Sequence, residues 1–345
     1  MSKRLQFGLF TEFECATGMD EARAFDEAMD EMTAAEAMGF DAVWLAEIHF
    51  QKNRSLLAAP LVVATAIAAR TRRVKIGIAV QVLPLSHPLR LAEDVATVDH
   101  LSKGRLDFGV GRSGLPDHYR SFNIPYAESR DRFTETLDIL VKAWTQERFT
   151  HEGKYFQFRD VCVIPKPFQK PHPPILVAAT AGETYGLVGR MGLPIFIAVR
   201  TTSIADLKRY IGGYHEAWRE AGHPGHGEVA LIVPVYVADS ARRARDEPEA
   251  STMHFFRTVA EALAQGGTHR EDRAEQLKRL SYDEILKELV VYGTPEAVTE
   301  RLLELRETLG YSTLSVWMNV GSHLPHQRVL ASMRLFADRV VPRLA

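Results

Sequence analysis

The stretch KIGIAVQVLPLSHPLRLAEDVATVDHLSKGRLDFGVG, residues 75–111, decides the fold. It begins with an apolar run rich in β-branched residues at 75–82 and ends with a second apolar run at 105–110. Between them, residues 88–101 carry apolar side chains at helical spacing, and Gly104 follows, where a helix commonly ends in the left-handed conformation. A strand, a helix and a second strand in this order predict a βαβ unit with two parallel strands.

The same alternation of strand and helix recurs about eight times along the chain. Gly39, Gly192, Gly222 and Gly310 follow further helical patterns in the same way. Repetition of this kind predicts an α/β fold, a (β/α)8 TIM barrel, in a single domain that spans residues 1–345. We expect strands at residues 5–10, 42–46, 75–82, 105–110, 175–178, 194–199, 228–237 and 313–318, and helices at 21–38, 88–101, 127–146, 204–221 and 295–309.

Two segments interrupt this alternation. Residues 149–163, FTHEGKYFQFRDVCV, alternate around a Glu-Gly pair, which predicts an inserted β-hairpin. Residues 241–281 form a long charged segment that contains Gly266 and Gly267. Because long excursions on the catalytic face of a barrel can serve as lids, we take this segment as a candidate mobile lid.

The composition is that of a globular enzyme. Of the 345 residues, 46% are hydrophobic and 25% charged, and the net charge of -2 comes without a basic stripe, so we expect no nucleic-acid partner. Cys15 and Cys162 fit no zinc-ligand spacing, so we expect no metal. We expect neither a signal peptide nor a membrane span, because the apolar run at 56–69 is too short, and we therefore expect a cytoplasmic location.

The motif GVGRSG, residues 109–114, matches the glycine pattern of dinucleotide-binding loops. Such a loop opens a helix whose N-terminus meets the pyrophosphate, but here a helical pattern resumes only near residue 127. We favour another role, in which Gly111 lets the backbone approach a ligand and Arg112 lies at the C-terminal end of a barrel strand. Arg112 and Arg130, at the start of the next helix, could then bind one phosphate together.

The sequence ATAGETYG, residues 179–186, is a second candidate for anion binding. It follows an apolar strand and precedes a helix, so backbone N–H groups and the Thr184 hydroxyl are available to a phosphate. The alternative is an ordinary turn between a strand and a helix, in which the hydroxyl only caps the helix. The residues alone favour neither interpretation.

Four segments, taken together, resemble the bacterial luciferase-like monooxygenases, in the order found in the luciferase α-chain. The most specific is VLPLSHPLRLAEDVATVDHLSKGRLDFGVGRSG at 82–114, and the others are GFDAVWLAEIHF at 39–50, YGTPEAV at 292–298 and ASMRLFADRVVPRL at 331–344. The resemblance implies a (β/α)8 barrel that binds FMN and acts as a flavin-dependent monooxygenase.

The resemblance also assigns residues to an FMN site. Arg112 and Arg130 stand where the family holds the FMN phosphate. Thr180 and Ala181 replace a glutamate and a serine of the luciferase α-chain, so a hydroxyl contact is lost and backbone amides would take its place. The Ala79–Val80 peptide matches the family's non-prolyl cis peptide beneath the flavin ring. The implied FMN-binding residues are Ala79, Val80, Gly111, Arg112, Arg130, Thr180, Ala181 and Thr184.

The segment AEIHF, residues 46–50, carries the main departure from the family. Ile48 replaces the first histidine of the luciferase motif EHHF, which luciferase requires for its aldehyde chemistry, whereas His49 keeps the second position. A histidine at the end of a barrel strand is able to act as acid or base near neutral pH, so His49 is the candidate catalytic residue. The resemblance implies a buried supporting role for Glu47. Further candidates for the pocket wall are Cys15, Gln81, His118 and Trp317.

The resemblance implies a reaction and its partners as well. Reduced FMN would react with O2 to give a flavin C4a-hydroperoxide that transfers one oxygen atom to a small organic substrate. A separate NAD(P)H:flavin reductase would supply the reduced FMN. Family members pair as dimers, and the apolar run at 56–69 could supply the surface of a homodimer.

Two alternatives remain open. In the first, the same barrel uses a reduced deazaflavin for hydride transfer, as a related branch of the superfamily does. In the second, the chain is a flavin-binding subunit without turnover, like the luciferase β-chain, which the loss of the first histidine at Ile48 favours. Retention of Arg112 and Arg130 argues against the second alternative.

Overall fold

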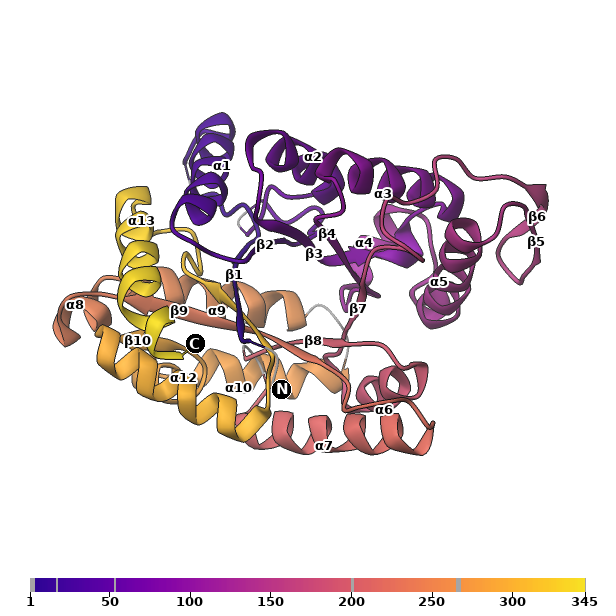
Figure 1. Ribbon diagram of the computed structural model, residues 1–345. Coiled ribbons are helices and arrows are strands. Elements are labelled where there is room, and N and C mark those ends of the chain that lie inside the picture. Colours follow the sequence, from indigo (N-terminus) through magenta and orange to yellow (C-terminus); the bar gives the residue numbers. More distant parts are fainter. Residues whose placement is uncertain (1–3, 17, 53, 200–201, 265–267, 345) are drawn as a thin grey trace.

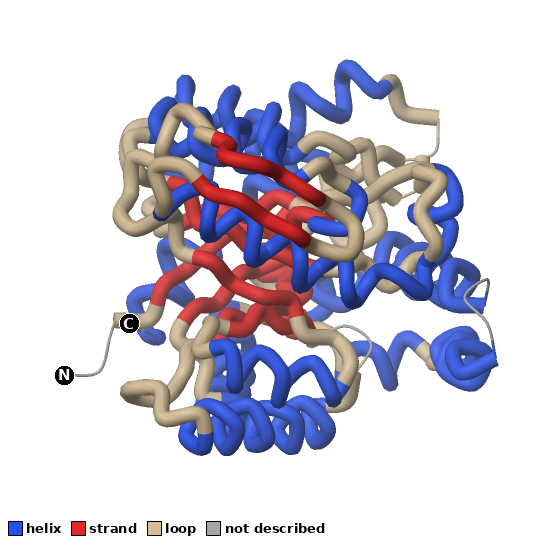
Figure 2. Tube along the Cα trace, turned by 90° about the vertical axis from the view of Figure 1, so that its right-hand side faces the viewer, coloured by secondary structure: helices blue, strands red, loops and turns tan. Residues whose placement is uncertain are grey.

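The computed structural model describes residues 4–16, 18–52, 54–199, 202–264 and 268–344, without the side chains of residues 268–273. Within this part of the chain, eight parallel strands lie at the centre of the molecule, surrounded by helices (Figures 1 and 2). The strands are β1 (Gln6–Thr11), β2 (Ala42–Leu45), β3 (Lys75–Val82), β4 (Leu106–Gly111), β7 (Ile175–Ala178), β8 (Ile195–Ala198), β9 (Val229–Val237) and β11 (Thr313–Trp317).

The strands close into a barrel. Their order is β9–β11–β1–β2–β3–β4–β7–β8, and β8 pairs back onto β9 in parallel. Each strand expected from the sequence is present, with ends that differ by no more than one residue. The prediction of a (β/α)8 TIM barrel is therefore confirmed.

Helices cover the outside of the barrel, and the five expected from the sequence are present with ends shifted by no more than two residues. Those five are α1 (Glu21–Ala37), α3 (Pro88–Ser102), α5 (Ser129–Thr145), α7 (Ile204–Glu220) and α12 (Pro295–Leu309). The others are α2 (Pro60–Arg70), α4 (Pro116–Ser121), α6 (Gly182–Met191), α8 (Ala241–Asp246), α9 (Glu249–Ala264), α10 (Thr268–Arg279), α11 (Tyr282–Glu288), α13 (His326–Leu335) and α14 (Val341–Leu344). In the described residues, no helix is long and apolar enough to cross a membrane.

The β-hairpin predicted at 149–163 is confirmed. Strands β5 (Phe149–Glu152) and β6 (Gln157–Val161) pair antiparallel and project beside α5, away from the barrel (Figure 1). A short strand that the sequence analysis missed, β10 (Val291–Gly293), extends the sheet beyond β9. Another difference is α4, which opens at Pro116 although we expected no helix before residue 127; proline at the first helical position favours such a start.

The candidate lid at 241–281 is largely helical, because α8, α9 and α10 occupy it. Phe255 and Phe256 of α9 belong to the same apolar cluster as Trp317, and Phe255 meets the Trp317 ring edge-on at 4.9 Å. The two glycines of this segment, Gly266 and Gly267, lie outside the described residues. The segment therefore covers one end of the barrel, and its mobility stays a prediction.

Aromatic side chains fill the inside of the barrel. Trp44 packs against Phe196 with ring centroids 4.9 Å apart, and Phe10 packs against Trp317 at 5.2 Å. Trp44 has room because a neighbour on β3 is glycine: a Cβ atom on Gly77 would lie 2.0 Å from the indole ring. A large side chain beside a small one fills the interior without voids.

Strand β3 leaves its regular register near its C-terminal end. Its pairing with β4 shifts between Ile78 and Gln81, and the Ala79–Val80 peptide bond inside this bulge is cis, as the resemblance implies. The carbonyl oxygen of Ile78 lies against Gly109, where a Cβ atom would approach it to 2.1 Å. The glycine motif thus lets β4 pack closely against the bulge.

Replacement of Gly109 by alanine is expected to destabilise the protein by about 1–3 kcal/mol, because the added methyl group would overlap the carbonyl oxygen of Ile78. Urea denaturation followed by circular dichroism measures the change. Gly212→Ala is the matched control, since Gly212 is exposed in α7 and a Cβ atom there meets nothing within 4 Å. A Gly109→Ala variant as stable as Gly212→Ala would contradict this account of the packing.

Candidate active site

Polar and charged side chains gather on one face of the molecule, where the barrel strands end. The C-terminal ends of parallel barrel strands meet at the same face, and this fold places its active sites there. The residues at or just beyond the strand ends are Glu12 and Glu14 after β1, Glu47 and His49 after β2, Gln81 in β3, Arg112 after β4, Thr180 to Thr184 after β7 and Trp317 in β11.

The carboxylate of Glu47 joins the end of β2 to β3. It accepts hydrogen bonds from Gln81 Nε2 at 2.6 Å and from the backbone N–H of Val82 at 2.7 Å, and its other oxygen lies 2.7 Å from His49 Nε2. The Glu47 and His49 side chains are both shielded from solvent. Glu47 is thus buried and holds both the ring of His49 and the amide of Gln81, and its supporting role in the reaction stays a prediction.

His49 faces a second imidazole. The ring of His118, from α4, meets that of His49 edge-on with centroids 5.6 Å apart, and His118 Nδ1 lies 3.5 Å from Ser113 Oγ. Burial, together with the nearby His49 and Arg54, lowers the pKa of His118 to about 4, so its ring is neutral at neutral pH. Ile48 packs with the apolar cluster inside the barrel. The structure thus places the imidazole of His49, which is bound by the Glu47 carboxylate, beside the neutral imidazole of His118.

The cis peptide Ala79–Val80 lies in β3, just before Gln81, and β3 pairs with β4. Ala79 and Val80 are half-buried, and Gly111 leaves space for Val80, since a Cβ atom on Gly111 would lie 2.4 Å from a Val80 methyl group. Gln81 Oε1 is buried and has no hydrogen-bond partner among the described residues. A buried acceptor of this kind is available to a ligand that carries an N–H or O–H group.

Arg112 and Arg130 lie near the N-terminus of α6. Arg112 Nη1 donates to Ser129 Oγ at 2.9 Å, next to Arg130 at the start of α5, and Arg130 forms an ion pair with Glu183 in the first turn of α6. Ala181 precedes α6 and gives it no side-chain cap. Uncapped N–H groups and two guanidinium groups together favour an anion.

The remaining members of the predicted FMN site belong to the same loop. Thr180 and Ala181 are exposed, and Thr184 is half-buried with its backbone N–H bonded to Ala181 O at 2.9 Å. The structure therefore brings both arginines and the 180–184 loop together. Among the described residues, no three histidine, cysteine, aspartate or glutamate side chains form a group that could hold a metal ion.

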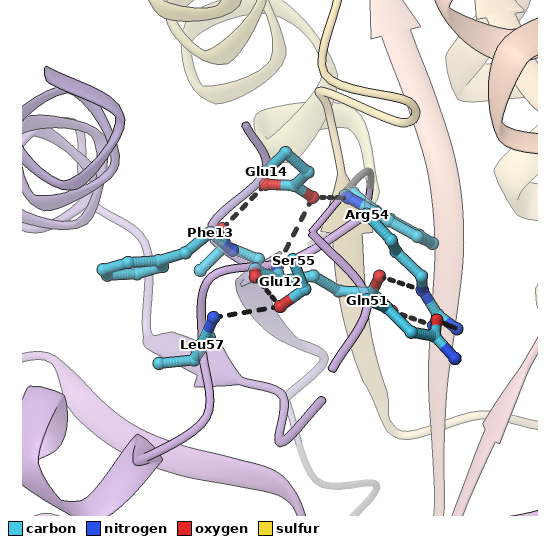
Figure 3. Close-up of polar contacts among 9 residues, drawn as sticks. Glu12, Phe13, Glu14, Gln51, Arg54, Ser55 and Leu57 are labelled. Atoms are coloured by element: carbon cyan, nitrogen blue, oxygen red, sulfur yellow. Dashed lines mark hydrogen bonds and ion pairs between the residues drawn. The ribbon is translucent and has the colours of Figure 1, made fainter. Parts of the chain in front are cut away.

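A buried ion pair joins the end of β1 to the loop after β2 (Figure 3). Arg54 donates through Nε to Glu12 Oε2 at 2.6 Å and through Nη2 to Glu12 Oε1 at 2.5 Å. Ser55 Oγ donates to the Glu12 carbonyl oxygen and accepts the backbone N–H of Leu57 at 3.0 Å. Sequence analysis missed this pair. The available signal was the position of Glu12 and Glu14 directly after the first strand.

Glu14 lies next to the ion pair but contacts only uncharged donors among the described residues. It accepts hydrogen bonds from Trp317 Nε1, from Thr11 Oγ1 at 3.1 Å and from the Glu12 backbone N–H at 3.4 Å. Burial, reinforced by the charge of Glu12, raises the pKa of Glu14 to about 8. Glu14 is therefore mostly protonated at neutral pH.

Comparison with known proteins identifies the family. The family model described as luciferase-like monooxygenase matches residues 5–312. The chain is 25% identical over 352 residues to the oxygenase component of the flavin-dependent trigonelline monooxygenase of Acinetobacter baylyi, a match that covers 98% of this chain and 95% of that protein. It is also 25% identical over 360 residues to the alkanal monooxygenase alpha chain of the Kryptophanaron alfredi symbiont, covering 99% of this chain and 98% of that one.

Solved structures share the fold over the whole chain. The monooxygenase RslO1 from Streptomyces bottropensis superposes with a TM-score of 0.85 at 27% identity, covering 99% of this chain and 100% of that one. The oxygenating constituent of 3,6-diketocamphane monooxygenase from Pseudomonas putida, in complex with FMN, gives 0.85 at 22% identity, with 99% of each chain covered. An F420-dependent secondary alcohol dehydrogenase gives 0.77 at 20% identity, covering 99% of this chain and 100% of that one. The chain therefore belongs to the luciferase-like monooxygenase family and is an enzyme.

Proposed function

We propose that the chain is the oxygenase component of a two-component monooxygenase, which binds reduced FMN at the C-terminal mouth of the barrel and uses O2 to oxygenate a small organic substrate. The observation that carries this proposal is that Arg112 bonds to Ser129 beside Arg130, which pairs with Glu183 at the uncapped N-terminus of α6. The cis peptide at Ala79–Val80 adjoins this group, because Val80 lies against Gly111. When bound, reduced FMN supplies the electrons that activate O2.

The residues at the mouth suit both the phosphate and the flavin ring of FMN. Arg112 and Arg130 would bind the phosphate as charge-assisted donors, together with the backbone N–H groups of Ala181 and its neighbours. The flavin ring would lie against the Ala79–Val80 peptide, where Gly111 keeps the approach clear of a further side chain. Gln81 Oε1, which has no partner within the described ranges, is an acceptor for an N–H group of the flavin ring or for a donor on the substrate.

His49 is the residue that we propose for proton transfer at the mouth. Glu47 fixes its ring through Nε2 at 2.7 Å, which leaves Nδ1 as the nitrogen available to the reaction. The His49→Gln variant is expected to bind reduced FMN as the wild type does, but its FMN complex should react with O2 roughly a hundredfold more slowly, because the group for proton transfer is lost. Stopped-flow absorbance measures the rate, and an unchanged rate would remove His49 from proton transfer.

Two partners complete the proposal. A separate NAD(P)H:flavin reductase supplies reduced FMN, as an oxygenase component of the kind named for the trigonelline monooxygenase requires. The GVGRSG motif instead packs against β3 through Gly109 and Gly111. A homodimer would form through α2, where Val62 is 70% exposed. Sedimentation equilibrium tests the dimer, and a monomer at micromolar concentration would contradict it.

The FMN site is tested by the difference between FMN and riboflavin, which lacks the phosphate. Anaerobic titration with each reduced flavin should show that the wild type prefers FMN. Arg112→Ala should weaken FMN binding by roughly tenfold to a hundredfold, because a charge-assisted hydrogen bond contributes about 1.5–3 kcal/mol, and should leave riboflavin binding unchanged. The complex with reduced FMN is then mixed with O2 and with mixtures of candidate substrates, and the O2-dependent formation of oxygenated product is measured.

Failure to bind reduced FMN would overturn the proposal. Binding of reduced deazaflavin F420 in its place, followed by hydride transfer without O2, would establish the first alternative. Binding of FMN without any O2-dependent reaction would establish the non-catalytic subunit.

Glu183 should oppose the phosphate, because its carboxylate occupies Arg130 at the N-terminus of α6. Glu183→Gln is expected to raise the affinity for FMN about twofold to fivefold, since exposed ion pairs contribute up to about 1 kcal/mol. Fluorescence titration measures the change. Glu300→Gln, on the exposed surface of α12, is the matched control and should bind FMN as the wild type does. A Glu183→Gln variant with unchanged affinity would show that Arg130 does not reach the phosphate.

A further inference from the structure

A small cavity lies at the mouth of the barrel, between the end of β1 and α9. Its volume is about 10 Å³, enough for one group of the size of a water molecule. Glu14 and Arg54 line one side, and His254 and Phe255 of α9 line another. Trp317, at the end of β11, closes it from the barrel side. The cavity therefore adjoins the proposed active site but shares no residue with the proposed FMN site.

The charges around this cavity do not balance. Arg54 is engaged by both oxygens of Glu12, so this pair is neutral as a unit. Glu14 is left with the indole N–H of Trp317 and the hydroxyl of Thr11 as its side-chain partners. An ionised Glu14 would thus give the cluster a charge of −1, because the single positive charge of the neighbouring Arg54 is already matched by Glu12. A buried carboxyl group in this situation either keeps its proton or binds a cation.

An unpartnered hydroxyl points to a ligand in the same cavity. Ser322 lines the cavity and is only 7% exposed, and its Oγ has no hydrogen-bond partner among the described residues. Buried hydroxyl groups are normally hydrogen-bonded. The cavity thus offers two acceptors, Glu14 and Ser322, beside the aromatic rings of Phe255 and Trp317, which meet edge-on at 4.9 Å.

We propose that this cavity binds a primary ammonium group of the substrate, which donates to the Glu14 carboxylate and to Ser322 Oγ. The inference rests on the proposed function, since it names the chemical class of the substrate. A primary ammonium group is about the size of a water molecule and fits the cavity, whereas a quaternary ammonium group does not. Glu14 is then a specificity-determining residue.

Binding should release a proton. Glu14 is mostly protonated at pH 7, and it must ionise to hold the ammonium group. The charged and titratable groups around it are Glu12, Glu31, Arg54 and, across the cavity on α9, His254. The negative charges of Glu12 and Glu31 raise the pKa of Glu14. A bound cation acts in the opposite direction, so release of the Glu14 proton on binding is the expected sign of a cation in the cavity.

The test is isothermal titration calorimetry of the flavin-free full chain at pH 7 with butylammonium and with butyltrimethylammonium. Butylammonium should bind and release close to one proton, which measurements in buffers of different ionisation enthalpy detect. Butyltrimethylammonium should bind at least tenfold more weakly. Glu14→Gln should lose butylammonium binding and proton release, Ser322→Ala should weaken binding severalfold, and Glu300→Gln should behave as the wild type.

Three results would overturn the proposal: no binding of butylammonium by the wild type, equal binding of the quaternary analogue, or unchanged binding by Glu14→Gln. Titration of each variant with reduced FMN runs in parallel. Normal FMN binding together with any of these results would reject the ammonium site alone, and loss of FMN binding in the wild type would reject the proposed function instead.

Melting temperatures show whether Glu14→Gln remains folded. The raised pKa of Glu14 means that its contribution to stability is full below the ordinary pKa of 4.5 and is lost as the pH rises toward 8. Glutamine is neutral at every pH, so the variant should gain in melting temperature relative to the wild type between pH 5 and pH 8. A variant with parallel pH dependence would contradict the raised pKa of Glu14 and, with it, the predicted release of a proton on binding.

Discussion

The arrangement of the mouth depends on the hydrogen bonds that meet the carboxylate of Glu47. A carboxylate that is only 7% exposed needs donors close by, since a buried charge without partners is costly. Gln81 Nε2, the Val82 backbone N–H and His49 Nε2 all lie within 2.7 Å of it. One group thus fixes the loop after β2, the amide of Gln81 and the backbone that follows the cis peptide. Loss of this carboxylate would disturb all three at once.

The fold was predictable because barrel strands are buried on both faces and appear as short apolar runs between amphipathic helices. The contacts within the site were not, because they join residues that are distant in sequence. Glu14 and Trp317 are 303 positions apart, and Arg130 and Glu183 are 53 apart. The cis peptide was expected only from the resemblance, and residues such as Arg54 fall outside every motif.

Local signals also failed where tertiary packing decides the structure. Helix α4 begins at Pro116, and Leu115 before it provides no side-chain cap, so the proline was the local sign of the helix. The segment at 241–281 looks polar and irregular in sequence, but Phe255 and Phe256 of α9 pack over the mouth of the barrel. The GVGRSG motif, in contrast, matches the glycine pattern of a dinucleotide-binding loop although packing alone accounts for one of its glycines. Its Gly109 is explained by the approach of the Ile78 carbonyl and needs no dinucleotide.

The mouth is electrically asymmetric, and this asymmetry restricts how ligands can lie in it. Arg112 and Arg130 follow β4, whereas Glu12 and Glu14 follow β1, and the barrel order places β2 and β3 between them. A phosphate is attracted to the first side, whereas on the second side the charge of Arg54 is already matched by Glu12. On the proposed function, FMN can therefore lie in one orientation, with its phosphate away from β1. The space beside Glu14 is then left to the substrate. The carboxyl group of Glu14 and the Ser322 hydroxyl, which has no hydrogen-bond partner in the part of the chain that the structure describes, both lie there.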